Sequence, residues 1–289
     1  ASVLCYILHS MNAIVFGLFG LIVGSFLNVL VLRSGVRAAT GRSACMSCAR
    51  GILWFDLIPI LSWLHLGGRC RFCRSKISAQ YPLVEITTAI LFAIIGMSPL
   101  PLFLSVLALL MVAILIAISV YDIKHTIIPD AWVWSFNALA FSSIFLSSPY
   151  SIHATLYALL AGPLAALPLF ALWLFSRGRW MGLGDAKLAL GIGWLLGPVY
   201  GIVAIFFAFI IGAIVSVPLL FFSSALWRKI LNRITPTHAS RKTISGLIMQ
   251  SEVPFGPYLV ASFITLWLLI IYGNEPLLAT GLLSLSFSL

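Results

Sequence analysis

Gly182-Leu183-Gly184-Asp185-Ala186-Lys187 is a short polar break in a long apolar half of the chain. The apolar run Ile152–Phe175 precedes it, and another, Leu188–Leu196, follows it directly. Because a spanning helix needs about 17 to 25 largely apolar residues, this pattern predicts membrane helices on both sides of a tight turn. Asp185 is one of seven acidic residues among 289. An acid beside a membrane helix is costly to keep, so Asp185 is either a functional residue or a cap of the next helix.

The composition excludes a soluble protein. Hydrophobic residues make up 62% of the chain and charged residues 8%, whereas a soluble domain carries about 25% charged residues. We therefore predict an all-α polytopic membrane protein with about eight transmembrane helices. Gly197-Pro198 separates the sixth from the seventh, and a merged pair would leave seven. The expected span cores are Met11–Leu32, Pro82–Gly96, Leu100–Tyr121, Ala131–Phe145, Ile152–Phe175, Lys187–Leu196, Val199–Leu226 and Gly256–Tyr272.

The basic residues predict the orientation. With eight spans, all 17 Lys and Arg residues lie on one side of the membrane, whereas with seven spans the basic segment Arg228–Lys242 would fall on the other side. Because Lys and Arg concentrate in cytoplasmic loops, this bias favours eight spans, with the basic loops on the cytoplasmic side of a bacterial inner membrane. It also explains the net charge of +10 through topology and contact with membrane lipids, so we expect no nucleic-acid partner.

The loop expected after the first helix, residues 33–81, carries four cysteines in the pattern C-x2-C-x21-C-x2-C. Two such pairs suit a tetrahedral zinc site, and stable disulfides are not expected in the reducing cytoplasm. We therefore predict a structural Zn²⁺, with redox-active or unmetallated thiols as the alternatives. No internal repeat stands out in the sequence. The four predicted ligands are Cys45, Cys48, Cys70 and Cys73.

Asp122 and Asp130 flank the turn expected between the third and fourth spans, on the same side as Asp185. Asp130 follows a proline and precedes an apolar run, which is a good N-cap position. Asp122 lies at the C-terminal end of its span, where the helix dipole disfavours an anion, so capping does not explain it. Two carboxylates brought close share a proton, and one can act as a base while the other acts as an acid. The candidate pairs for aspartic proteolysis are Asp122 with Asp185 and, as a competitor, Asp130 with Asp185.

Together these motifs resemble those of the bacterial type IV prepilin peptidases, leader peptidases that also N-methylate pilins. That family belongs to the wider group of GxGD intramembrane aspartic proteases. Beside the hexapeptide, the cysteine pairs and Asp122, the resemblance rests on ordered motifs along most of the chain. These are Gly24-Ser25-Phe26-Leu27-Asn28-Val29, Trp54-Phe55-Asp56-Leu57-Ile58-Pro59, Tyr81-Pro82-Leu83-Val84-Glu85 and Ile128-Pro129-Asp130.

The resemblance implies that Asp122 and Asp185 are the catalytic pair. It further implies that type IV prepilins or pseudopilins are cleaved after a Gly at the cytoplasmic face, and that the new N-terminus is methylated from S-adenosylmethionine. It assigns residues 1–97, two helices with the cysteine loop, to the methyltransferase part and residues 98–289, six helices, to the peptidase part. One departure is Cys45-Met46-Ser47-Cys48-Ala49, where the family commonly has C-P-x-C-G. No glycine fingerprint marks a methyl-donor site, so its residues are unassigned.

Four further residues support this hypothesis. Gly182 and Gly184 would let the backbone approach an extended substrate, and Lys187 would favour an ionised Asp185. Glu85, expected in the first turn of the second span, either complements the helix dipole or belongs to a substrate or methyl-donor site. The alternative functions are a peptidase without methylation and a zinc-containing membrane scaffold or transporter whose acids relay ions.

Overall fold

The computed structural model describes residues 2–34, 41–147, 152–223 and 254–273. Within these ranges the chain is helical, with no named strand and two isolated β-bridges in the cysteine loop. The expected Val199–Leu226 run continues beyond the described residues, and the basic segment Arg228–Lys242 lies outside them. The elements are α1 (Ser2–Arg33), η1 (Trp54–Leu57), α2 (Leu61–His65), α3 (Gln80–Met97), α4 (Leu102–His125), α5 (Asp130–Ser147), α6 (Ile152–Ser176), α7 (Leu183–Ser223) and α9 (Gly256–Gly273).

Several of these helices can cross a membrane, which confirms the all-α, multi-pass prediction. Among the described residues, six helices are long and apolar enough to do so: α1 from Ser10, α3, α4, α6, α7 to Pro218, and α9. The 18-residue helix α5 is not among the six. The expected cores agree with the observed helices, although α4 continues to His125 and so places Asp122 inside its last turn.

The break expected at Gly197-Pro198 is present inside α7. Gly197 has φ 79° and ψ 171°, a conformation nearly confined to glycine. A Cβ on Gly201 would lie 3.2 Å from the Cα of Gly193, whereas residues eight apart in a straight helix are separated by about 12 Å. The chain therefore turns back at Gly197, and α7 consists of two arms. A count of eight spans requires α5 and both arms to cross the membrane, and it stays a prediction.

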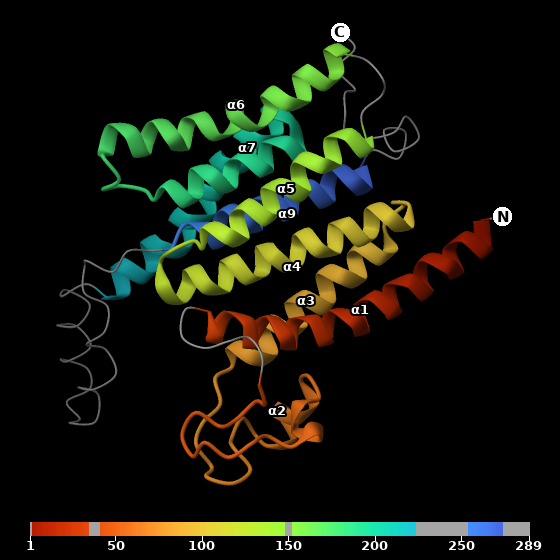
Figure 1. Ribbon diagram of the computed structural model, residues 1–289, viewed down its shortest axis with the longest axis vertical. Coiled ribbons are helices and arrows are strands. Elements are labelled where there is room, and N and C mark those ends of the chain that lie inside the picture. Colours follow the sequence, from red (N-terminus) through yellow and green to blue (C-terminus); the bar gives the residue numbers. More distant parts are fainter. Residues whose placement is uncertain (1, 35–40, 148–151, 224–253, 274–289) are drawn as a thin grey trace.

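The helices follow one another across the molecule, with α4 near the middle (Figure 1). α1 packs along α3 on one side of α4, and α6 packs along α7 on the other side, with α5 and α9 between. The α4 span is 56% buried, the largest share of the six candidate spans. Because lipid chains are as apolar as these side chains, close packing holds such helices together. The core side chains include Leu115 of α4, Phe136 of α5, Leu188 of α7 and Phe263 of α9, all at most 1% exposed.

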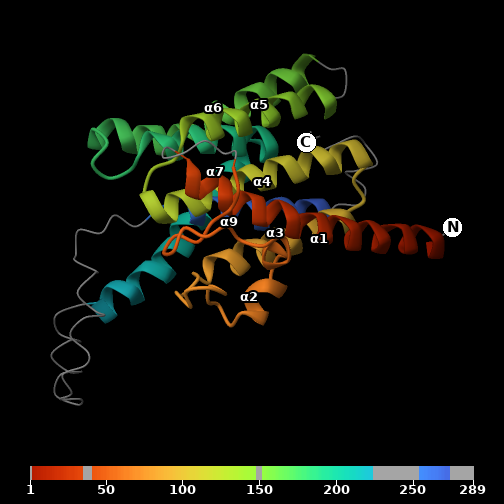
Figure 2. The ribbon, with the colours of Figure 1, turned by 60° about the horizontal axis from the view of Figure 1, so that its bottom comes forward.

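The cysteine loop, with η1 and α2, lies outside the helical bundle (Figures 1 and 2). It is next to the end of α1 and the start of α3. In Figure 1 the loop lies at the opposite side of the molecule from α6. This arrangement creates two regions that could carry chemistry: the loop, and the place where α4, α7 and α9 meet.

Candidate active site and metal centre

The four cysteines predicted to bind metal come together. Their sulfur atoms all lie within 4.8 Å of one another, and the Sγ atoms of Cys45 and Cys73 are 3.7 Å apart. Four thiolates at the usual Zn–S distance around a tetrahedral zinc are separated by about 3.8 Å. All four cysteines are free thiols. The geometry therefore fits a metal ion, and the all-sulfur donor set is the one that structural zinc prefers.

The metal site is built from two copies of one hairpin, residues 43–52 and 68–77, an internal repeat that the sequence analysis missed. In each copy the N–H of the first cysteine donates to the carbonyl five residues later, at 2.9 Å. The residue after the second cysteine, Ala49 or Arg74, has a positive φ of 56° or 57°. Apart from the two cysteines, the copies share only an isoleucine in last place, Ile52 and Ile77. That signal was too weak to reveal the repeat.

The thiols of the first pair differ electrostatically. The backbone N–H groups of Cys48 and Ser47 lower the pKa of Cys45 to about 6. At Cys48 the N–H of Arg50 acts in the same direction, but burial and the neighbouring thiols outweigh it and raise the pKa to about 11. Four adjacent thiolates repel one another, so a divalent cation is needed to keep all of them deprotonated.

An ion pair and a buried carboxylate hold the cysteine loop in place. Arg71, in the second hairpin, binds Asp56 of η1 through two hydrogen bonds of 2.7 and 2.9 Å, which holds the pKa of Asp56 below its ordinary value. Glu85 lies in the second turn of α3, not in the first as expected, and is 6% exposed. Its Oε2 accepts the N–H of Ile60 at 2.8 Å. Glu85 therefore ties the loop to α3, and helix-dipole compensation is not its role.

Asp122, at the C-terminal end of α4, and Asp185, at the N-terminal end of α7, are both buried in the same region of the structure. Asp122 lies in the last turn of α4 and is 3% exposed, and Asp185 is the third residue of α7 and is 7% exposed. Their carboxylates are close enough to interact electrostatically. The N–H of Gly256, at the start of α9, donates to Oδ2 of Asp122 at 3.0 Å. Within the described residues, the buried Oδ1 of Asp185 has no hydrogen-bond partner, so it can bind a water or a substrate group.

Asp130 is in a different environment. Its side chain is 65% exposed, and its Oδ1 lies 2.6 Å from the Nζ of Lys187. This corrects the expectation that Lys187 acts on Asp185, because the ammonium group is directed to Asp130. It also disfavours the competing pair, since an exposed carboxylate neutralised by a lysine does not share a proton with a buried one.

The two glycines of the hexapeptide have different neighbours. A Cβ on Gly184 would lie 2.9 Å from the Cβ of Ile128, in the turn between α4 and α5. Gly184 therefore lets this turn pack against the start of α7, which accounts for the glycine without a substrate. A Cβ on Gly182 would meet nothing closer than 3.8 Å, and the role expected for Gly182 beside a substrate stays a prediction.

Comparison with known proteins gives the family. A model of the "Bacterial Peptidase A24 N-terminal domain" matches residues 18–98, and one of the "Type IV leader peptidase family" matches residues 109–217. The prepilin leader peptidase/N-methyltransferase of Bacillus subtilis is 35% identical over 202 residues, which cover 68% of this chain and 79% of the relative. The chain belongs to the type IV leader peptidase family.

Other members of the type IV leader peptidase family match at similar levels. The prepilin leader peptidase/N-methyltransferase of Aeromonas hydrophila is 29% identical over 289 residues, 89% of this chain and 90% of the relative. The type 4 prepilin-like proteins leader peptide-processing enzyme of Escherichia coli is 33% identical over 204 residues, 62% of this chain and 75% of the relative. No solved structure matches the chain.

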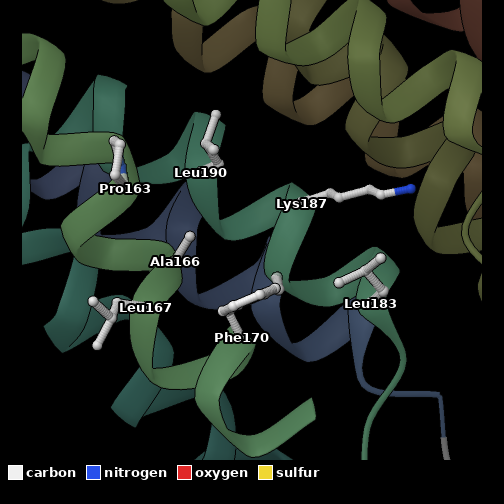
Figure 3. Close-up of a pocket in the computed structure, with 8 residues that line it drawn as sticks. Pro163, Ala166, Leu167, Phe170, Leu183, Lys187 and Leu190 are labelled. Carbon is white, nitrogen blue, oxygen red and sulfur yellow. The ribbon is translucent and has the colours of Figure 1, made fainter. Parts of the chain in front are cut away.

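An apolar groove between α6 and α7 lies apart from the aspartates of this leader peptidase family member. Figure 3 shows it with the Lys187 ammonium directed away from it. Leu183, Lys187 and Leu190 line it from one face of α7, whereas Asp185, two residues after Leu183, lies about 200° around the helix. The groove is therefore not the place where the two carboxylates meet. It is also lined by Pro163, Ala166, Leu167, Phe170 and Ala186.

Proposed function

We propose that this protein is a membrane aspartic endopeptidase that removes the leader of type IV prepilins or pseudopilins after a Gly, and then N-methylates the new N-terminus. The observation that carries the proposal is the buried meeting of Asp122 and Asp185, 63 residues apart by their numbers, in a chain of the type IV leader peptidase family. We propose that cleavage takes place at the cytoplasmic face of the bacterial inner membrane. The side to which the basic loops are predicted to face supports this orientation.

In the proposed reaction, Asp122 and Asp185 hold a water between them. The ionised carboxylate removes a proton from the water as its oxygen attacks the scissile carbonyl, and the protonated carboxylate polarises that carbonyl. The C–N bond then breaks as the departing amine takes a proton from the carboxyl group that had accepted one from the water, which restores the starting state of the pair. Oδ1 of Asp185 supports this assignment, because among the described residues it has no hydrogen-bond partner and can bind the water or the carbonyl.

A division of labour along the chain is part of the proposal. Residues 1–97 would form the methyltransferase part and use S-adenosylmethionine, and residues 98–289 would form the peptidase part. The four cysteines would hold a Zn²⁺, which supplies the cross-link that a small loop without a large apolar core needs in order to fold. Gly182, where an added Cβ would come no closer than 3.8 Å to its described neighbours, would lie along the extended substrate.

Mass spectrometry of a purified prepilin incubated with the protein tests the proposal. The expected products are a shortened pilin and, with S-adenosylmethionine, a further gain of one methyl group. Asp122→Asn and Asp185→Asn should each reduce cleavage at least about 1,000-fold, since a shared proton needs both carboxylates. Asp130→Asn is the matched control and should cleave normally. All variants should still methylate a pilin that has already lost its leader.

Three outcomes would contradict parts of this proposal. Normal cleavage by Asp122→Asn or Asp185→Asn would end the assignment of the pair. Cleavage without any methyl gain would favour a peptidase alone. No mass change with an authentic partner pilin would favour a scaffold or transporter, although the acids of an ion relay would be expected at mid-span and both of these acids lie at helix ends.

A further inference from the structure

The start of α9 contributes a donor to the aspartate pair from far along the chain. Gly256 is the first residue of α9 and is buried. Its N–H has no intrahelical acceptor, as is general for the first turn of a helix, and the next residue, Pro257, has no N–H at all. The Gly256 N–H points instead at Oδ2 of Asp122, 3.0 Å away. This bond satisfies Oδ2 of Asp122 and fixes the position of that oxygen.

The lack of a side chain at Gly256 is as important as its N–H. A Cβ at this position would lie 2.7 Å from Oδ2 and 3.3 Å from Cγ of Asp122. Non-bonded carbon and oxygen atoms do not approach to 2.7 Å, so a methyl group would force the carboxylate to move or the N–H to withdraw. The φ of Gly256 is not positive, so the glycine is required here by space and not by backbone conformation.

Ile128 connects this contact to the other aspartate. Its Cδ1 lies 3.3 Å from the Cβ position of Gly256, and its Cβ lies 2.9 Å from that of Gly184, the residue before Asp185. One side chain in the turn after α4 therefore packs against the starts of both α7 and α9. The three helices that surround the carboxylates are held in register at this point.

We propose that Gly256 is a positioning residue of the aspartate pair. Its N–H fixes Oδ2 of Asp122, and its missing side chain leaves the space that the carboxylate occupies. In the sequence, neither the acidic residues nor the GxGD motif points to this glycine. This inference rests on the proposed peptidase function. Gly256 would act on that reaction through Asp122, without touching the substrate itself.

Gly256→Ala tests this inference, with Gly212→Ala as the matched control. Each substitution adds one methyl group at a helix contact: Gly256→Ala adds it 2.7 Å from Oδ2 of Asp122 in α4, and Gly212→Ala adds it 3.2 Å from the ring of Tyr258 in α9. We expect Gly256→Ala to lower kcat for prepilin cleavage about 100-fold, as misplacement of a reacting group by about 1 Å can do. KM should stay within about threefold, because substrate binding is not altered. Methylation of a pre-cleaved pilin should be unchanged, and Gly212→Ala should retain cleavage.

A second variant separates positioning from packing. Ile128→Val removes the Cδ1 that a methyl group at 256 would approach, but leaves the contact with Asp122 unchanged. The double variant Ile128→Val/Gly256→Ala should therefore stay about as slow as Gly256→Ala. Full recovery of kcat would show that Gly256→Ala slows cleavage through a clash with Ile128 and not with Asp122, and it would overturn the inference. Wild-type kcat in Gly256→Ala, or a parallel loss of methylation, would also overturn it.

Hydrogen exchange tests the same contact without a change at Gly256. In Asp122→Ala the Gly256 amide loses its acceptor, and its exchange should become at least about tenfold faster. An unchanged rate would overturn the inference even if the Gly256 variants failed to fold. The proposed function fails by a different result, normal cleavage by Asp122→Asn, so the two failures are distinguishable.

Discussion

At the scale of single residues, the backbone conformation of the two cysteine hairpins shows the consequence of a residue that the sequence alone marks only as unusual. Ala49 and Arg74 occupy equivalent positions in the two cysteine hairpins, and both have a positive φ. For a residue with a Cβ this conformation is unfavourable by about 1 to 2 kcal/mol. The departure noted at Ala49, where the family commonly has glycine, therefore has a physical consequence: the first hairpin carries strain that glycine would remove.

Replacing Ala49 by glycine should stabilise the metal site. The relief of strain, less the entropy that glycine loses on folding, leaves about 1 kcal/mol, which corresponds to a roughly fivefold slower loss of Zn²⁺ to a chelator. Ala44→Gly is the control, since Ala44 lies in the same hairpin without a positive φ, and it should give no gain. Equal effects of the two substitutions would show that the φ of Ala49 is not strained.

At the scale of elements, apolar runs and helix breakers predicted most of the helices, because membrane length and glycine conformation are local constraints. Contacts between distant segments were not predictable in this way. The N–H of Ile60 reaches Glu85, Lys187 reaches Asp130, and Gly256 reaches Asp122 across 134 residues. The pairing of Asp122 with Asp185 was expected only because the dipole argument left Asp122 unexplained and a family resemblance supplied its partner.

The turn within α7 provides a test at this scale. A Cβ on Gly197 would meet none of the described residues within 4 Å, so the expected effect of Gly197→Ala is on the backbone. Because residue 197 has a backbone conformation that alanine rarely adopts, Gly197→Ala should lower the free energy of unfolding by about 1 to 3 kcal/mol. The unfolding temperature in detergent should then fall by roughly 2 to 10 °C. Gly273→Ala likewise meets no atom within 4 Å in the part of the chain that the structure describes, has no positive φ, and should change little. Equal unfolding temperatures for the two variants would contradict a glycine-dependent reversal.

At the scale of the whole molecule, two sets of helices meet at α4. α4 packs against α1 and α3 on one side and against α5 and α9 on the other. It carries Asp122 at one end, whereas the cysteine loop is held to α3 through Glu85. Among the described residues, packed helices connect the loop with the aspartates. The proposed methyltransferase and peptidase parts should be separable by a change confined to the loop.

Removal of the metal should separate the two activities. A strong chelator, or Cys45→Ser, should unfold the loop because its small core cannot fold without a cross-link. Methylation of a pre-cleaved pilin should then fall at least about tenfold, while prepilin cleavage stays within about threefold of its starting value. Ser47→Ala, in the same hairpin but without a metal ligand, is the matched control and should retain both activities. Added Zn²⁺ should restore methylation after chelation but not in Cys45→Ser. Loss of cleavage in step with methylation would instead show that the loop completes the peptidase site, and would place the substrate's leader between the cysteine hairpins and the aspartates.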